Sequence, residues 1–126
     1  MKREVALFDL DGVVINTESQ YTGFWAGVGE RYFHSGTKFA NMIKGATLVQ
    51  IFDKYFRDAH KAQREITASL DDFEKSMSYE YIEGFPKFVS DIRRASIKTA
   101  VVTSNNIKKM ENVYRAHPEF HDLFDV

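Results

Sequence analysis

The chain has 126 residues, 44% of them hydrophobic, which is enough for one compact unit with an ordinary core. Its 17 Lys and Arg nearly balance 18 Asp and Glu, so no bulk charge recruits nucleic acid or an anionic membrane, and we expect neither as a partner. The sequence has no cysteine, which excludes disulfides, thiolate metal sites and cysteine nucleophiles. No apolar run near the N-terminus is long enough for a signal peptide or membrane span, so we expect a soluble, cytoplasmic protein.

The first predicted element is a short strand over residues 5–8, Val-Ala-Leu-Phe. Every position is apolar, which is typical of a central strand that is covered on both faces in a parallel sheet. Asp9 and Asp11 follow directly, and Gly12 after them allows the backbone to turn sharply.

Residues 16–83 are predicted to be wholly helical. The first helix carries apolar side chains at helical spacing, which gives it one buried face: Tyr21, Phe24, Trp25, Val28 and Tyr32. Further helices are expected around residues 39–43, after a cap at Thr47, and over residues 66–77.

Residues 84–126 change pattern. Gly84 and Pro86 begin a new helix, the β-branched residues 98–102 form a strand, and another helix follows the polar residues 103–105. This alternation is typical of α/β proteins. Residues 123–126 are expected to begin a further strand.

Ligands of open α/β sheets bind beyond the carboxyl ends of the strands, so we expect Asp9, Asp11 and Thr103 to face one crevice. Carboxylates two residues apart on an extended segment point to the same side. Two like charges that close require a cation between them or a shared proton. With Mg²⁺ bound, Asp9 can be both nucleophile and metal ligand while Asp11 transfers protons. The alternative is an acidic turn without chemistry.

Residues 103–105 supply a hydroxyl group and a helix N-terminus, which suit an anion such as phosphate. Thr103, Ser104 and Asn105 are therefore candidate phosphate-binding residues. The same residue types favour helix caps and turns, so a purely structural role stays open for each.

These segments resemble the haloacid dehalogenase superfamily, whose first motif is D-x-D-x-[TV] and whose second is an apolar strand ending in Thr or Ser. The matching residues are Asp9-Leu10-Asp11-Gly12-Val13, and Thr103 after "TAVV". The stretches "DGVVINTES" and "EGFPKFVSDIRRASIKTAVVTSN" look like its β-phosphoglucomutase-like branch. The resemblance implies an α/β fold with a Rossmann-like parallel sheet core, incomplete in this chain, in residues 1–15 and 84–126. It implies an inserted all-helical cap in residues 16–83.

The resemblance also implies roles for the matching residues. Asp9 would be the nucleophile that forms an aspartyl-phosphate, and Asp11 the acid that protonates the leaving oxygen and then the base that activates water. Thr103 would hold the phosphoryl group, helped by backbone amides near Leu10, Asp11 and Ser104. Mg²⁺ would bind the Asp9 side chain, the Asp11 carbonyl oxygen and an acid further along the chain.

The stretch "MIKGATL" resembles the substrate-specificity loop of the family, from which Lys44 would reach the substrate. The alternative is a solvated lysine before a helix break. Sugar-phosphate mutases of this branch carry an arginine and a histidine where this chain has Leu48 and Tyr21, which favours a phosphatase over a mutase.

Family members continue with a lysine and then an acidic pair, and we expect neither within residues 1–126. Lys108 and Lys109 come too soon after Thr103 to match that lysine. We therefore expect a truncated chain that alone is a weak or inactive phosphatase and self-associates through an open sheet edge at residues 98–102. A chain extended through the missing strands should be active and monomeric.

The leading hypothesis is a Mg²⁺-dependent phosphatase of a small phosphorylated metabolite, such as a sugar phosphate, with a mobile helical cap. The alternatives are a β-phosphoglucomutase-type phosphosugar mutase and a non-catalytic fragment or binding module. Carbon–halogen hydrolysis is disfavoured, because Asp11 has no obvious task in dehalogenation.

Overall fold

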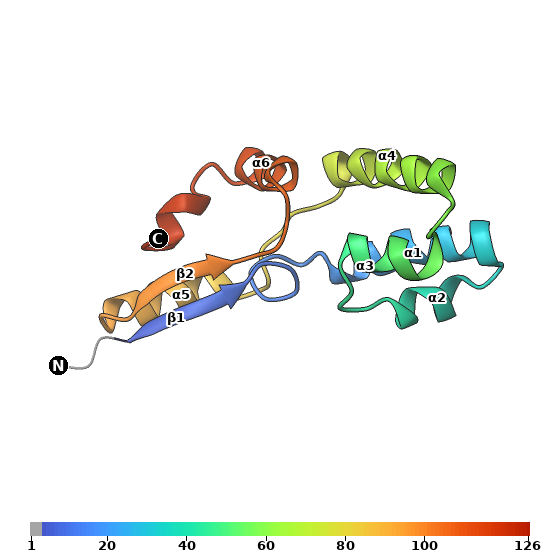
Figure 1. Ribbon diagram of the computed structural model, residues 1–126. Coiled ribbons are helices and arrows are strands. Elements are labelled where there is room, and N and C mark those ends of the chain that lie inside the picture. Colours follow the sequence, from blue (N-terminus) through green and yellow to red (C-terminus); the bar gives the residue numbers. More distant parts are fainter. Residues whose placement is uncertain (1–3) are drawn as a thin grey trace. The chain divides into compact units, whose positions relative to one another are not determined.

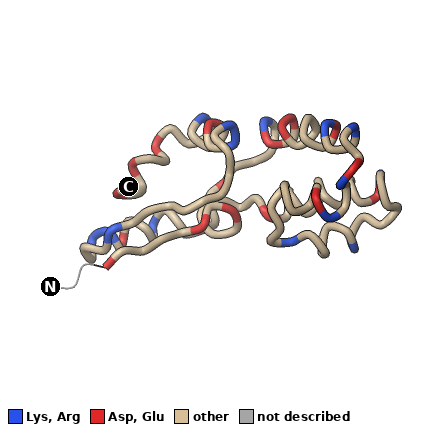
Figure 2. Tube along the Cα trace, viewed as in Figure 1, with Lys and Arg blue, Asp and Glu red and all other residues tan. Residues whose placement is uncertain are grey.

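The computed structural model describes residues 4–126, which belong to two compact units. The first unit combines the chain up to Glu18 with Ser78–Val126, and the second is Ser19–Met77. Charged side chains of both signs occur in both units (Figure 2), in line with a formal net charge of −1. No helix in this part of the chain is long and apolar enough to cross a membrane.

The first unit is built on two parallel strands, β1 (Val5–Asp9) and β2 (Lys98–Val102), with the helix α5 (Phe85–Arg94) lying along them (Figure 1). Val5 is opposite Lys98, and Asp9 is opposite Val102. Because the strands are parallel and in register, the chain leaves both of them at the same edge of the sheet. Both predicted strands are confirmed, and β1 is one residue longer than expected.

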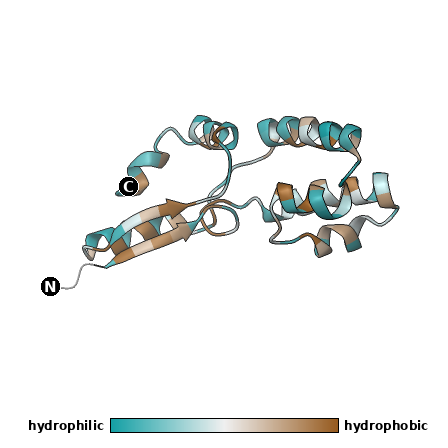
Figure 3. Ribbon diagram, viewed as in Figure 1, coloured by the Kyte–Doolittle hydropathy of each residue, from teal (hydrophilic) through white to brown (hydrophobic). Residues whose placement is uncertain are grey.

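Only one face of β1 is covered by the residues that the structure describes. Phe8 packs edge-on against Phe85 of α5, with ring centroids 5.3 Å apart. Leu7 points to the other face and is 65% exposed. The expectation of a strand covered on both faces is therefore wrong for this part of the chain, although residues 5–8 of the strand are all apolar (Figure 3). Successive side chains alternate between faces, and α5 covers one of them.

The predicted strand over residues 123–126 does not form. The chain passes from the helix α6 (Ile107–Ala116) through the short 3₁₀-helix η1 (Phe120–Leu123). It then returns to β2, where the backbone N–H groups of Asp125 and Val126 donate to the carbonyl of Thr99 at 2.9 and 3.2 Å. The Asp125 carboxylate accepts from the Thr99 backbone N–H at 2.8 Å. The Asp125 side chain thus accepts the hydrogen bond from the Thr99 N–H that the backbone carbonyl of a neighbouring strand would otherwise accept.

The two segments that connect the units pair with each other. The Asn16 N–H donates to the Glu80 carbonyl at 2.7 Å, and the Ile82 N–H donates to the Val14 carbonyl at 2.9 Å. Residues 77–83 are consequently not helical, and the predicted wholly helical range of 16–83 is too long at both ends.

The second unit holds four helices: α1 (Glu18–Phe33), α2 (Gly36–Met42), α3 (Leu48–Tyr55) and α4 (His60–Ser76). They enclose a core of six buried side chains: Val28, Phe39, Ile43, Ile51, Phe56 and Ile66. The predicted cap at Thr47 is confirmed, because its hydroxyl accepts from the Gln50 N–H while the Gln50 side chain accepts from the Thr47 N–H.

The close approach of α1 to α2 makes a glycine necessary in α1. A Cβ atom at Gly29 would lie 2.6 Å from both the Phe39 Cβ and the Ser35 carbonyl oxygen, whereas one at Gly23 would meet nothing within 4 Å. We expect Gly29→Ala to lower the free energy of unfolding by about 1–3 kcal/mol through overpacking. Gly23→Ala should raise it by about 0.5–1 kcal/mol, because alanine favours helix. Chemical denaturation measures both, and equal effects would contradict the packing argument.

Candidate active site

The turn after β1 places Asp11 at the edge of the sheet. Gly12 has a φ angle of +79°, in the left-handed region that glycine adopts without a Cβ penalty. The N–H groups of Val14 and Ile15 both donate to the Leu10 carbonyl at 3.0 Å and close the turn. The Leu10 side chain is buried, so it anchors the turn and leaves only its backbone to face a ligand.

The turn after β2 is organised by Thr103 and Asn105. The Thr103 hydroxyl oxygen accepts from the Asn105 backbone N–H at 3.1 Å and from its side-chain amide at 2.5 Å. The cap of α6 is Asn106, whose side chain accepts from the Lys109 N–H at 2.9 Å. The cap interpretation of Thr103, Ser104 and Asn105 is therefore wrong, although Thr103 and Asn105 do form the turn.

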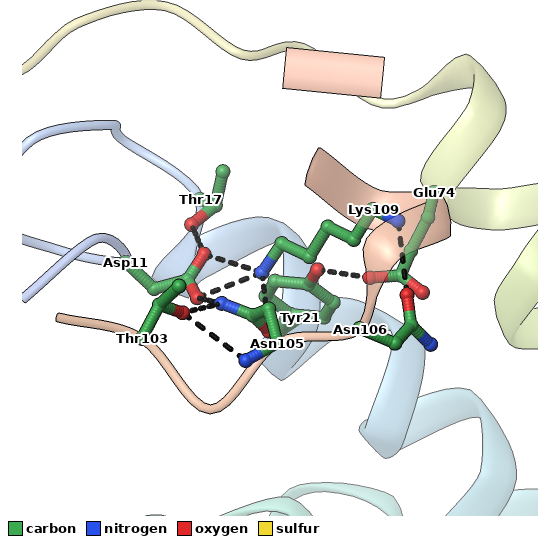
Figure 4. Close-up of polar contacts among 8 residues, drawn as sticks. All are labelled: Asp11, Thr17, Tyr21, Glu74, Thr103, Asn105, Asn106 and Lys109. Atoms are coloured by element: carbon green, nitrogen blue, oxygen red, sulfur yellow. Dashed lines mark hydrogen bonds and ion pairs between the residues drawn. The ribbon is translucent and has the colours of Figure 1, made fainter. Parts of the chain in front are cut away.

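The Asp11 carboxylate accepts hydrogen bonds from three separate segments (Figure 4). The Thr17 hydroxyl donates to Oδ1 at 2.5 Å, and the Asn105 side-chain amide donates to Oδ2 at 2.9 Å. The Lys109 ammonium group lies 2.7 Å from both carboxylate oxygens. The structure thus joins the turn after β1 to the turn and helix after β2.

Lys109 also sets the electrostatics of Asp11. Burial raises the pKa of the Asp11 carboxyl group, but the Lys109 charge and the hydrogen bonds from Lys109, Thr17 and Asn105 outweigh it, so the pKa lies below its ordinary value. The Lys109 side chain is 2% exposed, and a buried ammonium requires a counter-charge. The sequence predicted a cation between the two aspartates or a shared proton; of the two, Lys109 contacts Asp11 alone, and that prediction stays open.

Asp9 differs from Asp11 in its surroundings. It is exposed at the carboxyl end of β1, and within residues 4–126 its carboxylate forms no hydrogen bond or ion pair with another side chain. Ser104 is likewise exposed, one residue after Thr103 at the same edge of the sheet. The Asp9 carboxylate is therefore open to an incoming ligand.

A magnesium ion would find part of its ligand set here. The part of the chain that the structure describes holds no group of three or more His, Cys, Asp or Glu suited to a metal ion. Sites for Mg²⁺ often use one or two carboxylates plus substrate oxygens, so the exposed Asp9 carboxylate and the Asp11 carbonyl fit such a partial site. The Asp11 carboxylate itself is occupied by Lys109.

Lys44, the remaining predicted site residue, belongs to the second unit. It is exposed in the turn after α2, and its role in substrate binding stays a prediction. Tyr21 lies in the same unit, where its hydroxyl donates to Glu74 of α4 at 2.5 Å (Figure 4).

Sequence reasoning missed two members of the network around Asp11. Lys109 lies four residues before the fully buried Val113, on the buried face of α6, and a lysine at such a position signals a buried counter-charge. Thr17 is fully buried six residues after Asp11, and its spacing gave no signal.

Comparison with known proteins gives both a family and a fold. The model of the haloacid dehalogenase-like hydrolase family matches residues 6–126. A family IA, variant 3 HAD hydrolase from Entamoeba histolytica has 16% identity and a TM-score of 0.72, with 97% of this chain and 58% of that chain covered. CbbY from Rhodobacter sphaeroides, solved with phosphate, has 21% identity and a TM-score of 0.62, with 99% and 62% covered.

A HAD family hydrolase from Deinococcus radiodurans, with bound phosphate and sodium, has 20% identity and a TM-score of 0.58, with 97% of this chain and 55% of that chain covered. No curated protein matches the sequence.

The chain spans about 55–62% of the length of these three structures. At such identities the likeness shows the fold, which is an α/β, Rossmann-like core with a helical cap, and the described residues supply two strands of that core. The family match extends over nearly all of the sequence and confirms the predicted resemblance. The chain belongs to the haloacid dehalogenase-like hydrolase family.

Proposed function

We propose that this chain carries the catalytic edge of a Mg²⁺-dependent phosphatase that acts on a small phosphorylated metabolite, such as a sugar phosphate. The observation that supports it most directly is the contrast between an open Asp9 carboxylate and an Asp11 carboxylate held by three donor side chains. Solved structures of similar fold include CbbY with phosphate and a CbbY mutant with xylulose-(1,5)bisphosphate, which supports a phosphorylated substrate.

In the first step an Asp9 carboxylate oxygen attacks the phosphorus atom of a phosphate monoester. The bond between phosphorus and the leaving oxygen breaks, and Asp11, which must first take up a proton despite its lowered pKa, gives that proton to the leaving oxygen. The products are an aspartyl-phosphate on Asp9, a free alcohol and an Asp11 carboxylate.

In the second step the Asp11 carboxylate takes a proton from a water molecule whose oxygen attacks the same phosphorus atom. The bond between phosphorus and the Asp9 oxygen breaks, which releases inorganic phosphate and restores both side chains. Asp11 thus alternates between acid and base without a net gain of protons.

The turn after β2 would bind the phosphoryl oxygens. The Thr103 hydroxyl oxygen accepts two hydrogen bonds from Asn105, so its own proton can be donated to a phosphoryl oxygen. The N-terminus of α6 and the amides of Leu10, Asp11 and Ser104 would add donors. Mg²⁺, held by the Asp9 carboxylate and the Asp11 carbonyl, would offset the repulsion between Asp9 and the phosphate.

The helices within residues 16–83 would serve as the cap that excludes water during the reaction, with Lys44 contacting the substrate. We favour hydrolysis over phosphoryl transfer within a sugar phosphate, because Tyr21 and Leu48 replace the histidine and arginine of the mutases. The hydroxyl of Tyr21 is also engaged with Glu74 in the same unit.

The nucleophile is tested by Asp9→Asn, which keeps the size of the side chain and removes its charge. We expect Mg²⁺-dependent phosphate release from a panel of phosphorylated metabolites to fall by at least about 10³-fold, with an unchanged circular dichroism spectrum. Asp53→Asn, the same change at an exposed position of α3, should have no effect. Turnover in Asp9→Asn close to that of the wild type would exclude Asp9 as nucleophile.

The proton donor is tested by Asp11→Asn with two classes of phosphate monoester. The rate should fall by about 10²–10⁴-fold for an alkyl phosphate, whose leaving oxygen needs a proton. The loss should be smaller for an activated aryl phosphate, whose leaving oxygen does not. Steady-state kinetics on both substrates measures the difference, and losses of equal size would remove Asp11 from the role of general acid.

A further inference from the structure

Lys109 is a buried cation whose acceptors lie on both strand-end turns. Its ammonium group has three N–H donors and lies 2.7 Å from each Asp11 carboxylate oxygen and 3.1 Å from the Asn105 side-chain oxygen. The ammonium is therefore directed at Asp11 and Asn105.

The contact with Lys109 fixes which way the Asn105 amide points. Its oxygen faces the ammonium, so its NH₂ group faces Asp11 Oδ2 at 2.9 Å and the Thr103 hydroxyl oxygen at 2.5 Å. With the amide reversed, its NH₂ group would face a cation, and its oxygen would face the Asp11 carboxylate. Lys109 thus supports the contact between Asn105 and Thr103, together with Asp11 and the Asn105 backbone N–H.

We propose that Lys109 is the positioning residue of this site. It holds the Asp11 carboxylate and, through Asn105, the Thr103 hydroxyl in one fixed arrangement at the carboxyl edge of the sheet. The proposal rests on the proposed function, which gives Asp11 the proton transfers and Thr103 the phosphoryl group. Lys109 acts on the reaction through these side chains and does not touch the substrate.

A double-mutant cycle in the full chain tests this proposal. The proteins are the wild type, Lys109→Met, Asp11→Asn and the double variant, with Lys108→Met as the matched control, since Lys108 is the neighbouring exposed lysine of α6. The measurements are kcat and KM for an alkyl and an aryl phosphate monoester in the presence of Mg²⁺.

Lys109→Met should lower kcat for the alkyl phosphate by about 10–100-fold, as when a group that orients a metal ligand is removed. The loss should be smaller for the aryl phosphate, KM should change little, and Lys108→Met should behave as the wild type. In the Asp11→Asn background the same Lys109 substitution should lower kcat by less than about tenfold, because only its effect through Asn105 and Thr103 remains.

Three results would overturn the proposal. The first is that Lys109→Met lowers kcat by the same factor in the wild-type and Asp11→Asn backgrounds. The second is that its main effect is a rise of KM for both substrates. The third is that a folded Lys109→Met variant keeps the kcat of the wild type. The first two are expected of a lysine that binds the phosphate directly. If Lys109→Met does not fold, the double variant decides, because it removes both charges: a kcat less than about tenfold below that of Asp11→Asn supports the proposal, and a larger loss overturns it.

A failure of the proposed function gives a different result. Where the wild type releases phosphate from no monoester in Mg²⁺, which is also the result expected of a truncated chain, the free energy of unfolding of the same four proteins tests the pair of Asp11 and Lys109 instead. Non-additive effects of the two substitutions support Lys109 as the group that holds Asp11, and additive effects overturn it.

Discussion

The ion pair between Asp11 and Lys109 is the interaction on which the candidate site depends. An ammonium group that is 2% exposed is stable only beside a negative charge, and here that charge is a carboxylate two residues after the proposed nucleophile. Removing the charge of Asp11 or of Lys109 alone would leave the other charge without its counter-charge. The pair also makes Asn105 bridge Asp11 and Thr103. One electrostatic requirement therefore fixes the relative positions of two turns that are far apart in the sequence.

The register of the two strands makes this pair possible. Asp9 is opposite Val102, so Asp11 and Thr103 both lie just beyond the same edge of the sheet. The cap at Asn106 then starts α6 directly after the turn, which places Lys109 in the first turn of the helix. A long side chain from that position reaches back to Asp11, whereas a helix that began at Thr103 would present a different residue. The position of the Asn106 cap thus determines that Lys109 is the residue whose ammonium group reaches Asp11.

The features that were predicted correctly from the sequence are those that depend on local patterns. The bounds of β2 follow from a β-branched run, and the cap of α3 follows from Thr47 and its spacing to Gln50. The shared edge of Asp9, Asp11 and Thr103 follows from parallel topology. Lys109 was missed because its partner lies 98 positions away, and a charged residue is assigned to solvent unless a partner is known. The strand at residues 123–126 failed because a carboxylate took the place of a backbone acceptor.

The paired connections between the two units have a mechanical consequence. Residues 14–16 and 80–82 are joined by backbone hydrogen bonds, so the two crossings form a narrow two-stranded ribbon. Such a ribbon bends and twists as one body, but its strands cannot slide past each other without breaking both bonds. The backbone pairing therefore keeps residues 14–16 and 80–82 in one register, although more than sixty residues separate them in the sequence.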